Sequence, residues 1–216
     1  MEAFGCDNSK IKICSLPRVD DILTDNNAAS RFFTENPGLS HDKIVLYLPT
    51  FRERDAYIAE QLKVEFRDID GYRLIISAHP LFSKIKIENE FSYSGDFSTY
   101  DLMKIADVII TDYSACAFEA SVLMKPLYFF VPDYDEYSSE RGINVDLKKE
   151  MPSATFENAE ELVNAIKLNN YDFDMLYKFK CEYVENTKAN NAEILAKFVS
   201  MSVSYTHLRA HETSAH

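Results

Sequence analysis

Residues 107–120 read DVIITDYSACAFEA, and this stretch decides the fold. The run 108–110 is β-branched, too short for a core helix and bounded by polar residues, which is typical of a buried parallel strand. Small polar residues follow, and the sequence then favours a helix over 115–124 with Ser114 as its N-cap. A strand that turns tightly into a helix aims backbone N–H groups at one point, which suits a phosphate. The alternative is an ordinary strand-to-helix junction without a ligand.

The composition limits the class of protein. At 216 residues, the chain is long enough for one sizeable core. Its 23 Lys and Arg against 35 Asp and Glu give a net charge of -12, so we expect no nucleic-acid partner. The four cysteines (Cys6, Cys14, Cys116 and Cys181) form no C-x-x-C pair, which indicates a reducing compartment such as the cytoplasm. We also expect no signal peptide and no transmembrane helix.

Strands and helices alternate from Lys43 onward. The expected strands cover 43–52, 72–78, 108–110 and 126–132, with a further short strand in 85–94, and the expected helices cover 55–68, 100–106, 115–124, 156–166 and 174–201, the last interrupted near 186–191. This alternation predicts an α/β fold, a Rossmann-like parallel sheet with helices on both faces. Residues 1–40 hold a short β-like run at 11–15 and, after residue 21, a polar stretch rich in Asn, Asp and Ser, and they are expected to be a connector that leads into the domain 41–201.

Polar residues follow four of these strands. Thr50 and Arg52 come after the first, His79 after the second, residues 111–114 after the third and residues 133–141 after the fourth. Because ligands of parallel α/β sheets bind beyond the carboxyl ends of the strands, these residues are candidates for one site. Residues 133–142 are equally compatible with a solvated loop, and His79 alone with a hydrogen-bonded structural histidine.

Five motifs together resemble the CDP-glycerol glycerophosphotransferase family. They are Leu-Pro-Thr-Phe-Arg at 48–52, His-Pro at 79–80, the stretch 107–119, Lys-Pro at 125–126 and the stretch 133–142. The resemblance covers about residues 10–199, and Leu16-Pro17-Arg18-Val19-Asp20 is similar to the family's Pro-Arg-Asn-Asp connector, with Val19 in place of Asn.

The resemblance implies an enzyme of teichoic acid biosynthesis. Such an enzyme transfers glycerol phosphate or ribitol phosphate from a CDP-activated donor to a hydroxyl of a growing, lipid-linked polymer, and CMP leaves. The implied fold is glycosyltransferase-B-like, with two Rossmann-like domains, of which this chain supplies the carboxyl-terminal, nucleotide-binding one. Without its N-terminal domain we expect the fragment to be inactive. The implied location is cytoplasmic, peripheral at the inner face of the plasma membrane, and no cofactor or metal is implied.

The resemblance also implies a set of site residues. Ser114 and the backbone of Ala115 would hold the diphosphate, and Arg52 would fork onto phosphate oxygens. His79 is assigned a catalytic role, stabilisation of the leaving phosphate, because the family's base is a histidine of the amino-terminal domain. The remaining residues implied to contact CDP-glycerol are Arg18, Thr50, Ser77, Ala78, Glu119 and Arg141.

The chain departs from the family pattern at three of these positions. Ala115 stands where the family commonly has a second Ser, Glu119 where Asp is frequent, and Ser77 where Arg is often found. One hydroxyl donor and one positive charge are therefore absent. We expect donor affinity or substrate choice to differ, while the scaffold stays the same.

Two rival functions remain, a glycosyltransferase-B enzyme that uses a nucleotide sugar and a non-catalytic nucleotide-binding or docking domain. A preference for cytidine over uridine diphosphates separates the first from the proposed enzyme. Residues 202–216 lie beyond the resemblance and look like translated sequencing-adaptor read-through. Their His207 and His211 have the i, i+4 spacing of a metal pair, but we expect no metal there.

Overall fold

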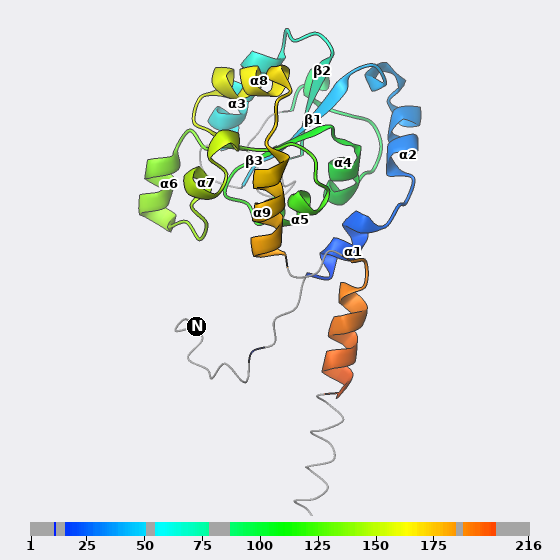
Figure 1. Ribbon diagram of the computed structural model, residues 1–216. Helices are drawn as coiled ribbons and strands as arrows, with labels where there is room; N and C mark the ends of the chain where they lie inside the picture. Colours follow the sequence, from blue (N-terminus) through cyan, green and yellow to red (C-terminus); the bar gives the residue numbers. More distant parts are fainter. Residues whose placement is uncertain (1–10, 12–15, 51–54, 78–86, 185–187, 202–216) are drawn as a thin grey trace, which may run out of the picture.

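A computed structural model describes residue 11 and residues 16–50, 55–77, 87–184 and 188–201. Its centre is a sheet of five parallel strands (Figure 1), β1 (Lys43–Leu48), β2 (Tyr72–Ile76), β3 (Val108–Thr111), β4 (Leu127–Phe130) and β5 (Thr155–Phe156). The strand order is β2-β1-β3-β4-β5. The predicted α/β class with a parallel sheet is confirmed.

Buried side chains explain why these segments are strands. Every residue of β3 and β4 is buried, and only Lys43 of β1 is exposed. Because both faces of a parallel sheet are covered by helices, such strands read as continuous apolar runs rather than alternating ones. The pairs Leu48↔Thr111 and Thr111↔Phe129 end the ladders of β1, β3 and β4 at one level, which defines a common carboxyl edge.

Helices follow the strands. The longer ones are α3 (Asp55–Phe66), α4 (Thr99–Ile105), α5 (Cys116–Val122), α6 (Tyr134–Arg141), α8 (Ala159–Leu168) and α9 (Phe173–Tyr183), with α7 (Leu147–Glu150) and η5 (Pro152–Ala154) between α6 and β5. α3 packs on α8, while α5 packs on α9 (Figure 1). The stretch 133–141, which the sequence left open as a loop, contains the helix α6.

Residues 18–39 are helical and pack on the domain. They form α1 (Arg18–Leu23), α2 (Ala28–Glu35) and η3 (Pro37–Leu39), and α2 buries Phe32 in the main core beside Phe97. The polar composition of this stretch did not predict these helices; its role as a connector stays a prediction. The β-like run 11–15 lies outside the described residues except for Ile11.

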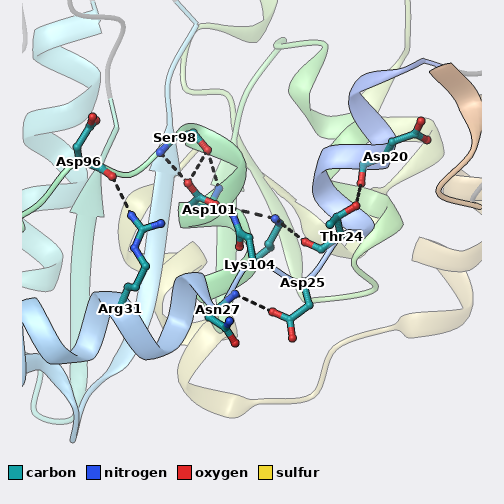
Figure 2. Close-up of polar contacts among 10 residues, drawn as sticks. Asp20, Thr24, Asp25, Asn27, Arg31, Asp96, Ser98, Asp101 and Lys104 are labelled. Carbon is teal, nitrogen blue, oxygen red and sulfur yellow. Dashed lines mark hydrogen bonds and ion pairs between the residues drawn. The ribbon is translucent and has the colours of Figure 1, made fainter.

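Polar contacts fasten this amino-terminal segment to α4 (Figure 2). Ser98 and Asp101 form a capping box at the start of α4. Asn26 Nδ2 donates to Asp101 Oδ1 at 2.6 Å, and Lys104 Nζ donates to the carbonyl oxygen of Thr24 at 2.9 Å. Arg31 adds a bond to the Asp96 carbonyl at 3.3 Å. These bonds hold α1 and α2 beside the helix that leads into β3.

The prediction of a short strand in 85–94 is wrong for residues 87–94. These residues contain the 3-10 helix η4 (Asn89–Phe91) instead. Phe91 is buried in the core, and the Ser94 N–H donates to Asn36 Oδ1 at 2.7 Å, so this segment bonds to side chains rather than to a neighbouring strand. Beyond α9, residues 191–201 form a last helix. Within the described part of the chain, no helix combines the length and apolar character that crossing a bilayer requires.

Candidate active site

Two consecutive side chains, Thr111 at the end of β3 and Asp112 directly after it, form hydrogen bonds to the end of β1 and the residues that follow it. Thr111 Oγ1 donates to the Leu48 carbonyl at 2.8 Å. One residue further on, the buried carboxylate of Asp112 accepts the Thr50 N–H at 3.0 Å on both oxygens, and its Oδ1 also accepts the Thr50 hydroxyl. The two strands are therefore fastened to each other beyond their last ladder pair, and Thr50 is fixed at the carboxyl edge.

The turn after β3 differs in one detail from its prediction. α5 begins at Cys116 with Ala115 as its N-cap, so the expectation that Ser114 caps the helix is wrong by one residue. Ser114 instead closes a local turn, in which its Oγ accepts the Cys116 N–H at 3.3 Å and its carbonyl accepts the Ala117 N–H at 3.1 Å. Serine side chains often compete for backbone N–H groups in this way before a helix starts.

A cavity of about 140 Å³ opens beside this turn, and we call it the strand-end cavity. Its wall contains residues 112–115, the loop 142–145, Tyr137 and several core side chains. Ser114 and Ala115 thus lie where the sequence analysis expected a ligand. Its polar lining residues include Asp112, Ser114 and Asn144, and Phe118, Phe129 and Phe179 are among its apolar ones.

Aromatic rings form one wall of the cavity. Tyr113 and Tyr137 stack with ring centroids 3.8 Å apart and planes inclined by 10°. The Tyr113 hydroxyl donates to Asp133 Oδ1 at 3.1 Å, which connects the turn after β3 to the start of α6. Arg141 lies over the Tyr137 ring at 5.8 Å from its centroid. Arg141 therefore lies beside one ring of this wall, but it is not among the lining residues.

Arg18 and Glu119 meet although 101 positions separate them. Arg18 Nη2 lies 2.7 Å from Glu119 Oε1, with the arginine side chain 53% exposed and the glutamate 2% exposed. Burial raises the pKa of Glu119, and the Arg18 guanidinium opposes that shift. Two candidate residues are thus joined to each other on the α1 side of α5, and Glu119 does not line the strand-end cavity.

The other candidates divide into described and undescribed residues. Ser77 directly follows β2, where its N–H donates to the Tyr47 carbonyl at 3.0 Å, so it lies on the same carboxyl edge as Thr50. Arg52, Ala78 and His79 lie outside the described residues. Their roles stay predictions, as do the ligand contacts of the described candidates.

Sequence reasoning missed two residues of this region. Asp112 lies within the candidate stretch 111–114 but is not among the residues implied to contact CDP-glycerol, although an acidic residue directly after a buried strand is an available signal. Tyr137 lies in the stretch 133–142, which from its sequence is equally compatible with a solvated loop, and nothing in the sequence shows that its ring stacks on Tyr113. Among the described residues, no group of three His, Cys, Asp or Glu side chains is arranged to hold a metal ion.

Curated relatives are proteins of teichoic acid synthesis. The chain is 31% identical to the teichoic acid ribitol-phosphate primase of Bacillus spizizenii, in an alignment that covers 92% of this chain and 55% of the relative. It is 36% identical to the teichoic acid glycerol-phosphate transferase of Staphylococcus aureus, over 76% of this chain and 46% of the relative. The chain therefore spans about half the length of these relatives.

The fold is also similar to a solved structure. The wall teichoic acid polymerase TagF, as its H444N variant, superposes with a TM-score of 0.71 at 22% identity, over 94% of this chain and 55% of that one. A sequence model of the family CDP-glycerol:poly(glycerophosphate) glycerophosphotransferase matches residues 1–201. Since this match takes in every described element from α1 to the last helix, the chain belongs to the CDP-glycerol:poly(glycerophosphate) glycerophosphotransferase family.

Proposed function

We propose that this chain is the donor-binding part of an enzyme that transfers glycerol phosphate or ribitol phosphate from a CDP-activated donor to a hydroxyl of a teichoic-acid-like polymer, with release of CMP. The observation that carries the proposal is the family match over residues 1–201, which includes every candidate residue of the carboxyl edge. The names of the relatives support a polyol-phosphate transfer of this kind.

Thr50, Ser77 and Ser114 support a nucleotide site at the carboxyl edge of β1, β2 and β3. All three lie within three residues of the carboxyl ends of strands of one parallel sheet, and ligands of such sheets bind at this edge. In the proposal, Ser114 and the Ala115 backbone hold the diphosphate beside the strand-end cavity. Arg52 and His79 are proposed to neutralise charge on the phosphates as CMP leaves.

The transfer itself needs little covalent chemistry from the protein. The attacking hydroxyl oxygen forms a bond to the glycerol-bearing phosphorus, the bond from that phosphorus to the bridging oxygen of CMP breaks, and the hydroxyl proton passes to a base. Alignment of the two reactants supplies much of the rate, on the order of 7–11 kcal/mol of barrier. We propose that the acceptor surface and the base belong to the part of the relatives' length that this chain does not span.

Two measurements test this function. Equilibrium binding should detect CDP-glycerol or CDP-ribitol but only much weaker binding of UDP-glucose, because a nucleotide-sugar enzyme would show the reverse preference. A CMP-release assay with CDP-glycerol and a lipid-linked glycerol-phosphate primer should detect no release from this chain alone. Primer-dependent release would contradict the assignment of the base to another part of the protein. Absence of binding to any cytidine nucleotide would favour the docking-domain alternative.

A further inference from the structure

Asp112 is a buried carboxylate to which the proposed function assigns no role. Its residue is 1% exposed, it comes directly after β3 and it lines the strand-end cavity. Its two oxygens accept the backbone N–H of Thr50 at 3.0 Å, and Oδ1 accepts the Thr50 hydroxyl as well. One side chain thus fixes both the backbone and the hydroxyl of a residue at the candidate site.

The chemistry of a carboxylate sets the direction of the hydroxyl bond. An ionised Asp side chain only accepts hydrogen bonds, so the Thr50 hydroxyl must donate its single proton to Asp112. The Thr50 oxygen keeps its lone pairs, and towards a ligand it acts as an acceptor. The oxygens of an ionised diphosphate are acceptors too. Thr50 in this orientation is therefore matched to a ligand group that donates a hydrogen bond, and not to phosphate.

On a cytidine diphosphate the hydrogen-bond donors are the ribose hydroxyls and the cytosine amino group. Thr50 follows β1, and β3, which leads to the proposed phosphate contacts at Ser114 and Ala115, is the neighbouring strand. The donor-bearing groups next to the phosphates are the ribose on the nucleoside side and the polyol on the other side, and of these two only the ribose is present in CDP itself. The ribose is therefore the part of the ligand that suits Thr50.

We propose that Asp112 is a positioning residue. It orients the Thr50 hydroxyl so that the Thr50 oxygen accepts a hydrogen bond from a ribose hydroxyl of the cytidine nucleotide, and this inference rests on the proposed function. Asp112 acts through Thr50 in this arrangement and does not itself contact the reacting atoms.

Thr111 provides a matched control. Its hydroxyl also joins the ends of β3 and β1, through the bond to the Leu48 carbonyl at 2.8 Å, and it is equally buried. It does not bond to Thr50. Thr111→Val therefore removes a neighbouring cross-strand bond and leaves the orientation of Thr50 intact.

The test compares CDP with 2′,3′-dideoxy-CDP, which keeps the base and both phosphates but has no ribose hydroxyl. Titrations of the wild-type chain and of Thr50→Val, Thr50→Ser, Asp112→Asn and Thr111→Val give the affinity for each nucleotide. We expect Thr50→Val and Asp112→Asn to weaken CDP binding about 5–10-fold and to change dideoxy-CDP binding less than about twofold. Thr50→Ser and Thr111→Val should keep the CDP affinity of the wild type within about twofold.

Each other result overturns a stated part of the proposal. If Thr50→Val weakened the binding of CDP and of dideoxy-CDP equally, Thr50 would contact phosphate or only support the fold. If Thr50→Val lost CDP affinity and Asp112→Asn did not, Asp112 would have no positioning role. Should Asp112→Asn fail to fold, Asp112→Glu keeps the charge but shifts it by one methylene, and it must show the same selective loss for CDP. If the wild-type chain binds no CDP, the proposed function fails, and this inference fails with it.

Discussion

Glu119 is a buried carboxylate whose charge is balanced by one half-exposed arginine. Its pKa is raised by burial, and the Arg18 guanidinium opposes that rise. A folded-state pKa above the unfolded value means that the stability from this group is fully present below the unfolded pKa of about 4.5 and is lost as pH rises through the folded pKa. Removal of Arg18 should raise the pKa further and so increase the loss at neutral pH.

We therefore expect Arg18→Ala to lower the free energy of unfolding by about 1–2 kcal/mol at pH 7.5, a value reduced from that of fully buried pairs because Arg18 is half exposed. The difference from the wild type should shrink at pH 4.5, where Glu119 takes up a proton. Urea unfolding at both pH values measures it. Arg67→Ala is the control, because its partner Glu90 is 47% exposed on its side chain, and we expect less than about 0.5 kcal/mol there. A pH-independent effect of Arg18→Ala would contradict this account.

Cys116 should be unreactive in the folded protein. Burial raises the pKa of its thiol to about 11, so only about one molecule in a thousand carries the reactive thiolate at pH 8. Cys181 is exposed on α9 and serves as an internal comparison. Iodoacetamide at pH 8 followed by peptide mass spectrometry should label Cys181 and spare Cys116, and urea should make both reactive. Equal labelling of the two in the native protein would show that the turn after β3 opens readily.

At the scale of elements, the sequence predicts best where burial and chain order act together. The apolar runs of β1, β3 and β4 and the alternation with helices are sufficient for the central strands. The two-residue strand β5 is not predicted, and its Phe156 lies in the expected helix 156–166. The sequence does not predict α1 and α2, because they are short and only Val19, Ile22, Ala28 and Phe32 are buried in them, within a stretch that is rich in Asn and Asp. The hydrogen bonds between Thr50 and Asp112 could not be predicted from the sequence either, since the two residues lie 62 positions apart and only the strand order brings them together.

Asp20 on α1 caps the last helix of the described chain. Its carboxylate accepts the N–H of Asn191 and that of Ala192, both at 2.9 Å, and the Asn191 amide at 2.8 Å. These bonds lower the pKa of Asp20, with the Ala192 N–H the largest cause. A depressed folded-state pKa means that this stabilisation is present above the unfolded pKa of about 3.8 and is lost as pH falls through the folded value.

Asp20→Ala should therefore increase hydrogen exchange across residues 191–201 and leave β1, β3 and β4 unchanged, because the helix loses its N-terminal acceptors. Hydrogen exchange with mass spectrometry measures this. Asp21→Ala is the control. Asp21 lies next to Asp20 on α1, and its substitution should not change hydrogen exchange in residues 191–201. Unchanged protection of 191–201 in Asp20→Ala would show that apolar contacts alone hold the helix.

Lys125 closes the end of α4. Its ammonium donates to the carbonyl oxygens of Met103 at 3.3 Å, Lys104 at 2.5 Å and Ala106 at 2.5 Å, where the helix leaves its last carbonyls without partners. Lys125→Met should lower the free energy of unfolding by about 2–3 kcal/mol, because charged hydrogen bonds to three carbonyls are lost. Denaturant unfolding measures this. The comparison variant is Lys104→Met, which loses the bond to the Thr24 carbonyl and a 3.9 Å ion pair with Asp101, and we expect it to cost about 1 kcal/mol. Similar losses in the two variants would contradict a special role for Lys125.

At the scale of the whole molecule, the family was recognisable because five short motifs occur in one order, although no single motif decides it. The site was predicted less completely. The sequence placed Ser114 and Ala115 at a strand end, and the structure places both in the wall of a cavity. The sequence did not indicate that Glu119 and Arg141 lie outside that wall, because the direction of a side chain on a helix depends on packing against distant elements.

We propose that this chain holds the cytidine diphosphate end of the donor at the carboxyl edge of its sheet. Calorimetric titration of the purified chain with CDP and, in parallel, with UDP tests it most directly. We predict weak binding of CDP, with a Kd on the order of 0.1–1 mM because the site is partly solvated, and at least about tenfold weaker binding of UDP. No heat of binding with CDP at millimolar concentration, or equal affinity for UDP, would contradict the account.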